Sequence, residues 1–83
     1  MGIEEERPLV SLEQLESGTH GIVRQLQGGK ELGNRLTAMG LSIGSEFEVM
    51  QNRGNGPVLV KVRGTRIAFG HGEALKILVE ELQ

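Results

Sequence analysis

Thirteen glycines divide this chain of 83 residues into short apolar segments, and their spacing limits what the chain can fold into. The clearest segment, residues 58–62, has valine at every second position, which is the period of a strand buried on one face. Glycine adopts the backbone conformations of tight turns and permits the close approach that strongly curved strands need. The pattern predicts a mainly β protein, a small and strongly bent β-barrel, with an open α+β sheet as the alternative fold.

Five strands and one inserted helix are expected in total. Polar or charged residues alternate with apolar ones over residues 46–52, as in a half-buried strand. Residues 52–57 are rich in glycine and asparagine, which predicts a hairpin loop between two strands. We expect strands at residues 19–25, 46–52, 58–62 and 65–70, and a fifth strand that begins at Ile77.

The helix is predicted over residues 30–39, where leucine and methionine recur at spacings of four and three on one face. Gly40 then ends the helix, because the residue just beyond a helix end often has a positive φ. Leu41 is expected to fold back against the last turn, and Gly44 to repeat the positive φ before the next strand. This run, RLTAMGLSIG, is the most specific segment of the chain.

The two ends of the chain contain less regular structure. Ser11 and Gln14 have the spacing of a capping box, which predicts a short helical turn, and residues 73–76 predict another. A single domain is expected over residues 9–80. A flexible tail, residues 1–8, precedes it, and a solvated tail follows it.

The composition excludes several classes of function. Cysteine is absent, so the chain has no disulfide framework, thiolate metal site or cysteine nucleophile. Aspartate is also absent and neither histidine has a local serine or cysteine partner, so we expect no enzyme. No apolar run approaches the ~20 residues that span a bilayer. Because the start of the chain is acidic rather than basic and apolar, we expect a cytoplasmic protein without membrane insertion.

Charge is unevenly distributed along the chain. The net charge is −2, but residues 24–66 carry seven lysines or arginines against three glutamates, a local balance of +4. A nucleic-acid binder would also place stacking aromatic residues among its basic ones, and this chain has only two phenylalanines. We therefore expect no nucleic-acid partner and a surface that contacts a protein. The candidate partner-binding residues are Arg35, Arg53, Lys61, Arg63 and Arg66.

Metal binding has weaker support in the sequence. An Fe(II) site commonly joins two imidazoles and a carboxylate, for which the weak candidates are His20, His71 and Glu73. The spacing does not show that the two histidines meet, although His71 and Glu73 are close enough in sequence to share a partial site. We expect no cofactor and no firm metal site, with weak binding of Fe2+ or another transition metal as the alternative.

In addition to these patterns, the sequence resembles the ferrous iron transport protein A family (FeoA) over residues 9–79. Most of the matching residues are glycines and core residues, which report on the fold more directly than on activity. In chain order they are Leu12, Leu15 and Gly18; Gly21-Ile22-Val23; Gly28-Gly29; Arg35-Leu36; Met39-Gly40-Leu41 and Gly44; Pro57, Val60 and Gly64; Ile67-Ala68-Phe69-Gly70; and Ala74, Ile77 and Val79.

This resemblance implies a Src-homology-3-like (SH3-like) barrel and a role as a small cytoplasmic accessory of ferrous iron uptake. The implied partner is FeoB, the membrane component, whose GTP-binding domain lies on the cytoplasmic side. The alternative is a free-standing regulatory module that binds a metal-dependent repressor, because a similar fold occurs as the carboxyl-terminal domain of such repressors. The sequence leaves the oligomeric state open, including a homo-oligomer.

Overall fold

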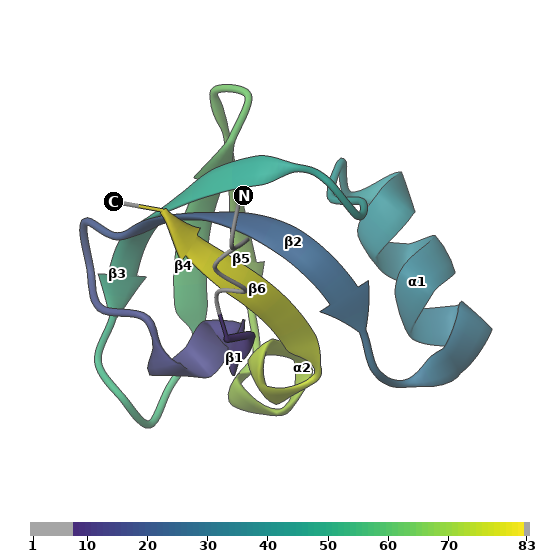
Figure 1. Ribbon diagram of the computed structural model, residues 1–83, viewed down its shortest axis with the longest axis horizontal. Helices are drawn as coiled ribbons and strands as arrows, with labels where there is room; N and C mark the ends of the chain where they lie inside the picture. Colours follow the sequence, from purple (N-terminus) through teal and green to yellow (C-terminus); the bar gives the residue numbers. More distant parts are fainter. Residues whose placement is uncertain (1–7, 83) are drawn as a thin grey trace, which may run out of the picture.

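Six antiparallel strands form one strongly curved sheet in the computed structural model, which describes residues 8–82 (Figure 1). The predicted tail at residues 1–8 falls, apart from Pro8, outside the described residues. Along the chain the elements are β1 (Val10–Ser11), a 3-10 turn η1 (Leu12–Gln14), β2 (His20–Leu26), α1 (Gly29–Ala38), β3 (Glu46–Asn52), β4 (Val58–Val62), β5 (Thr65–Phe69), α2 (His71–Leu75) and β6 (Ile77–Leu82). Across the sheet the strands follow the order β1-β6-β2-β3-β4-β5.

The predicted mainly β fold with an inserted helix is confirmed. β3 and β4 have the predicted bounds, because their side chains alternate between the core and solvent. β1 was not predicted, since two residues are too few to show a period. The solvated tail predicted over residues 80–83 is wrong up to Leu82, because β6 continues to that residue; residue 83 lies outside the described residues. The polar side chains of Glu80 and Glu81 conceal this strand, although both residues pair with β2.

The inner face of the curved sheet holds an almost entirely aliphatic core. Phe69 of β5 is fully buried and Phe47 of β3 is nearly so. Leu12 and Leu15, in η1 and just after it, are buried in the same cluster. The other buried members are Val23, Leu36, Leu41, Val49, Val58, Val60, Val62, Ile67, Ala74, Ile77 and Val79.

Gly21 of β2 lies directly opposite Phe47 of β3. A Cβ atom built on Gly21 would lie 2.6 Å from Cζ of Phe47 and 3.0 Å from the carbonyl oxygen of Glu80. The ring of Phe47 thus covers a part of the β2 backbone that has no side chain. This close approach requires glycine at position 21.

α1 connects the antiparallel neighbours β2 and β3 and lies beside the end of β2 (Figure 1). Its inner face places Leu36 in the core, with Leu32 and Met39 partly buried against it. Gly40 has a φ of +98°, and the N–H of Leu41 donates to the carbonyl oxygen of Leu36 over 2.9 Å. The predicted end of the helix is therefore confirmed: a positive φ stops it, and Leu41 returns to the core.

Gly44 repeats the positive φ, at +93°, just before β3. Its N–H donates to the carbonyl oxygen of Val23 over 2.7 Å, and the N–H of Val23 donates to the carbonyl oxygen of Ser45 over 2.9 Å. These bonds attach the loop after α1 to β2 and confirm the predicted turn.

The capping box predicted at Ser11 does not form. Ser11 makes no side-chain bond to the backbone of η1, and its hydroxyl donates instead to Oε2 of Glu13 over 3.4 Å. The second predicted turn is present as α2, which begins two residues earlier than expected. At the start of α2, Oε1 of Glu73 accepts a hydrogen bond from the N–H of Gly70 over 3.1 Å.

Candidate functional surfaces

Arg35 joins α1 to α2 through an ion pair. Its Nη2 lies 2.5 Å from Oε2 of Glu73, whose other carboxylate oxygen accepts the bond from Gly70. The Arg35 side chain is 64% exposed, so the pair stabilises the fold by at most about 1 kcal/mol and mainly sets the position of α1. From the sequence, Arg35 could either hold the helix against a neighbouring loop or contact a partner. The structure shows that it holds α1 to α2, and partner contact stays a prediction.

The cleft beside the pair, about 590 Å³, is lined by Gly28, Glu31, Leu32, Arg35, Gly72, Glu73 and Lys76.

The structure places the two histidines on separate elements. His20 begins β2 and pairs with Glu48 of β3, whereas His71 begins α2. Glu73, the third metal candidate, has both carboxylate oxygens engaged by Arg35 and Gly70. Within the part of the chain that the structure describes, no group of three or more histidines and carboxylates could hold a metal ion.

The basic candidates fall into two groups. Arg63 occupies the turn between β4 and β5, and Lys61 and Arg66 are directly opposite each other on those strands. Arg53 instead lies in the loop between β3 and β4, at the other end of β4. A strand of five residues spans about 17 Å, so Arg53 is separated from the other three.

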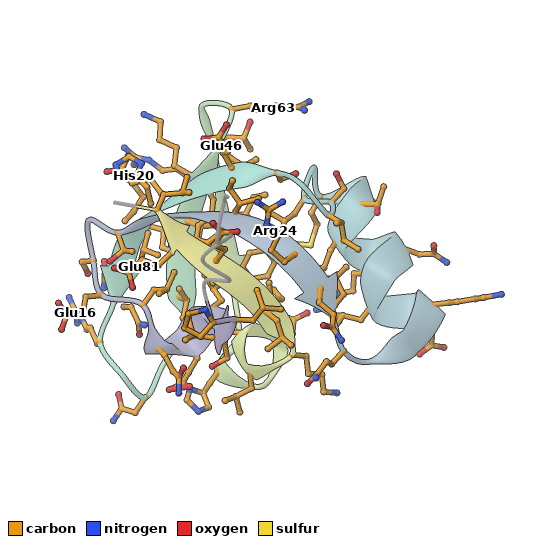
Figure 2. All side chains as sticks on the ribbon, in the orientation of Figure 1. Glu16, His20, Arg24, Glu46, Arg63 and Glu81 are labelled. Atoms are coloured by element: carbon orange, nitrogen blue, oxygen red, sulfur yellow. The ribbon has the colours of Figure 1, made fainter. Side chains whose placement is uncertain are left out.

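Lys61 and Arg66 belong to a row of polar and charged residues that crosses the outer face of the sheet. From β2 to β5, the paired residues are His20, Glu48, Lys61 and Arg66. Figure 2 shows Arg63 at the projecting β4–β5 turn, on the same side of the molecule as His20 and Glu46. A groove of about 470 Å³ lies here, lined by His20, Glu46, Phe47, Glu48, Lys61, Arg63, Gly64 and Leu82.

Asn52 fastens the segment around η1 to the end of β3, a role that the sequence does not reveal. Its Nδ2 donates to the carbonyl oxygens of Glu13 and Leu15, each over 2.7 Å. Its Oδ1 accepts from the N–H of Gly54 over 2.9 Å, and its own N–H donates to Oγ of Ser17 over 3.1 Å. The sequence marks Asn52 as a turn residue only, because its partners lie far away along the chain.

Among residues 8–82, neither helix is long and apolar enough to cross a membrane.

Known proteins match this chain over most of its length. A family model described as the FeoA domain matches residues 10–81. A putative Fe(2+) transport protein A of Methanocaldococcus jannaschii is 41% identical over 66 residues, which cover 80% of this chain and 79% of the relative. The crystal structure of an iron uptake regulatory protein (FeoA) is similar with a TM-score of 0.84 and 33% identity, over 90% of this chain and 100% of that one.

A manganese-dependent transcriptional repressor shares the fold alone. Its TM-score is 0.82 at 21% identity, and the similarity covers 94% of this chain but 44% of the repressor.

The SH3-like fold implied by the sequence resemblance is confirmed by the likeness to the solved FeoA structure. Because the family model covers nearly the whole described chain and the Methanocaldococcus relative is so similar, this protein belongs to the FeoA family.

Proposed function

We propose that this protein is a non-enzymatic accessory of ferrous iron uptake that docks on the cytoplasmic region of the membrane GTPase FeoB and modulates its activity. Family membership supports the proposal: the FeoA domain match extends over residues 10–81, and a relative 41% identical is named as a putative Fe(2+) transport protein. On this proposal the protein acts in the cytoplasm, where FeoB presents its GTP-binding domain.

A binding role suits the exposed chemistry of the barrel. The candidate acid and base groups lie on separate elements, with His20 on β2 and His71 on α2. Charged side chains, by contrast, gather on the outer face of the sheet around Lys61 and Arg66. Small barrels commonly act through loops and strand edges. We propose that the protein works by contact, and that Fe2+ is the cargo of the transporter rather than a resident cofactor of this chain.

Titration with Fe(II) under anaerobic conditions is expected to show no binding in the micromolar range. The reason is that Glu73, a carboxylate close to His71, is already engaged by Arg35 and Gly70. Calorimetry on the full chain measures this directly, with His71→Ala as the comparison. Micromolar binding that His71→Ala abolishes would contradict the prediction.

Docking on FeoB is tested by retention of the purified chain on an immobilised cytoplasmic region of FeoB. We expect wild-type protein to be retained, and charge reversal in the contact surface to reduce retention about tenfold. Arg63→Glu and Arg53→Glu make the same change at opposite ends of β4 and serve as controls for each other. If both variants bind as well as wild type, the basic residues are not the contact surface; if wild type is not retained, the proposed partner is wrong.

A regulatory module that binds a metal-dependent repressor is the second candidate function. The observation in its favour is the similarity of the fold to a manganese-dependent transcriptional repressor, with a TM-score of 0.82. At 21% identity this similarity concerns the fold alone, so we rank it below the transport role. An encoding gene beside that of a repressor, rather than beside that of a large membrane GTPase, would reverse the order.

A further inference from the structure

β5 forms one edge of the sheet, and no described strand pairs with its outer side. The strand order ends at β5, and β4 is the sole strand paired with it among residues 8–82. The opposite edge, β1, has two residues, whereas β5 has five. An edge strand of this length presents backbone donors and acceptors that can pair with another extended chain.

The turn between β4 and β5 determines which backbone groups face outward. Arg63 and Gly64, with φ of +51° and +81°, connect the paired residues Val62 and Thr65. Positive φ at both central residues is the geometry of a type I′ hairpin turn. In a two-residue hairpin, the residues that flank the turn exchange both backbone hydrogen bonds, so Val62 and Thr65 form a bonded pair.

Bonded and non-bonded pairs alternate along an antiparallel ladder. Thr65 and every second residue after it therefore bond to β4. The N–H and C=O groups of Arg66 and Ala68 point to the free edge instead. Both residues are exposed, while Ile67 and Phe69 between and after them are buried, so the outward backbone groups belong to the residues whose side chains lie on the outer face of the sheet.

The free edge is positively charged. Arg66 lies directly opposite Lys61 on β4, and Arg63 occupies the adjacent turn. Like charges directly opposite each other destabilise a strand pair. Lys61 has Glu48 on its β3 side, but within residues 8–82 neither Arg63 nor Arg66 forms an ion pair. Carboxylates on an added strand would supply the missing neighbour for Arg66.

We propose that the free edge of β5 binds an extended acidic segment of a partner protein by strand addition. Backbone hydrogen bonds would form with Arg66 and Ala68, and carboxylates of the segment would lie beside Arg63 and Arg66. A second copy of the same edge would add more positive charge, which disfavours it as the occupant. The inference rests on the proposed function only in assigning the segment to FeoB; the binding mode does not depend on that identity.

The probe is a synthetic peptide of about nine residues that alternates valine with glutamate, titrated into the isotopically labelled full chain. We expect the amide resonances of Arg66 and Ala68 to shift most and their hydrogen exchange to slow on binding. A peptide of the same length that alternates valine with lysine is expected to bind at least about tenfold more weakly. Equal binding of the two peptides, no binding of either, or shifts centred on other elements would each overturn the proposal.

Two variants separate the backbone contribution from the charge. Ala68→Pro removes one outward N–H without removing a bond to β4, and Arg66→Glu reverses the charge beside it. Each variant is expected to bind the acidic peptide at least about tenfold more weakly than wild type. Lys30→Glu, which reverses an exposed charge on α1, should bind as wild type does. Unchanged binding by Arg66→Glu, or dimerisation of the free chain through β5, would overturn the proposal. Thermal unfolding shows whether Ala68→Pro folds. If it does not fold, binding of the acidic peptide by Arg66→Glu alone tests the proposal.

Comparison with FeoB distinguishes this inference from the proposed function. If the chain is retained by FeoB but binds no acidic peptide, the strand-addition site is wrong and the proposed function stands. If the acidic peptide binds at β5 and FeoB does not retain the chain, the site stands and the proposed partner is wrong.

Discussion

Gly21→Ala is expected to lower the free energy of unfolding by about 2 kcal/mol. The new methyl group would overlap the ring of Phe47 at 2.6 Å and the carbonyl oxygen of Glu80 at 3.0 Å. Phe47 is nearly fully buried, so its ring has little room to move, and the backbone of β6 holds the other contact. Chemical denaturation of the two proteins, with a common slope against denaturant, measures the difference.

Gly33→Ala is the matched control. Gly33 lies within α1, where a methyl group on its Cα would meet no atom within 4 Å, and the variant should gain about 0.5 to 1 kcal/mol from the better helix propensity of alanine. The same chemical change therefore has opposite signs at the two sites. In the double variant Gly21→Ala with Phe47→Leu, removal of the ring should relieve part of the clash, giving a non-additive effect. Equal stability of Gly21→Ala and wild type would mean that β2 and β3 are not this closely packed.

Asn52→Asp is expected to destabilise the fold by about 2 to 3 kcal/mol at neutral pH. An ionised carboxylate has no donor, so it would lose both bonds that Nδ2 now makes and would face the carbonyl oxygens of Glu13 and Leu15 at 2.7 Å. The bond from Gly54 to the remaining oxygen would be kept. Thermal or chemical unfolding checks the size of the effect, and Asn55→Asp, an exposed change in the same loop, is the control.

The loss of stability in Asn52→Asp is also expected to depend on pH. The two carbonyl oxygens disfavour the charged form, so the pKa of the introduced carboxyl should rise in the folded state above its ordinary value of about 3.9. A group with a raised folded pKa stabilises the fold below its unfolded pKa, and that contribution is lost as pH rises through the folded pKa. The deficit of Asn52→Asp relative to wild type should therefore shrink in acid. A deficit that grows in acid, or one matched by Asn55→Asp, would contradict the role assigned to Asn52.

Strands whose side chains alternate between core and solvent could be predicted from the sequence. β3 and β4 were predicted to the residue because buried side chains alternate with more exposed ones over residues 46–50 of β3 and throughout β4. β1 is too short to show a period, and β6 ends in two glutamates whose backbone is held by β2. Pairing with a neighbour, which leaves no pattern in the sequence, maintains these two strands.

The candidate sites depend still more on contacts between distant segments. Arg35 of α1 meets Glu73 of α2 although the two residues lie far apart along the chain, and no local pattern records this. Arg53 and Arg63 look like neighbours in the sequence, but the hairpin places them at opposite ends of β4. The sequence could identify the charged residues; the register of the strands decides which of them share a surface.

β6 follows the other described strands along the chain, yet it lies between β1 and β2 in the sheet. β3, β4 and β5 follow one another directly, so their pairing needs only short loops to close. Val23 of β2, by contrast, pairs with Val79 of β6, which is synthesised much later. A chain still emerging from the ribosome can thus assemble the β3–β4–β5 meander early. β1 has no neighbour, and the core stays open on one side, until β6 has left the exit tunnel.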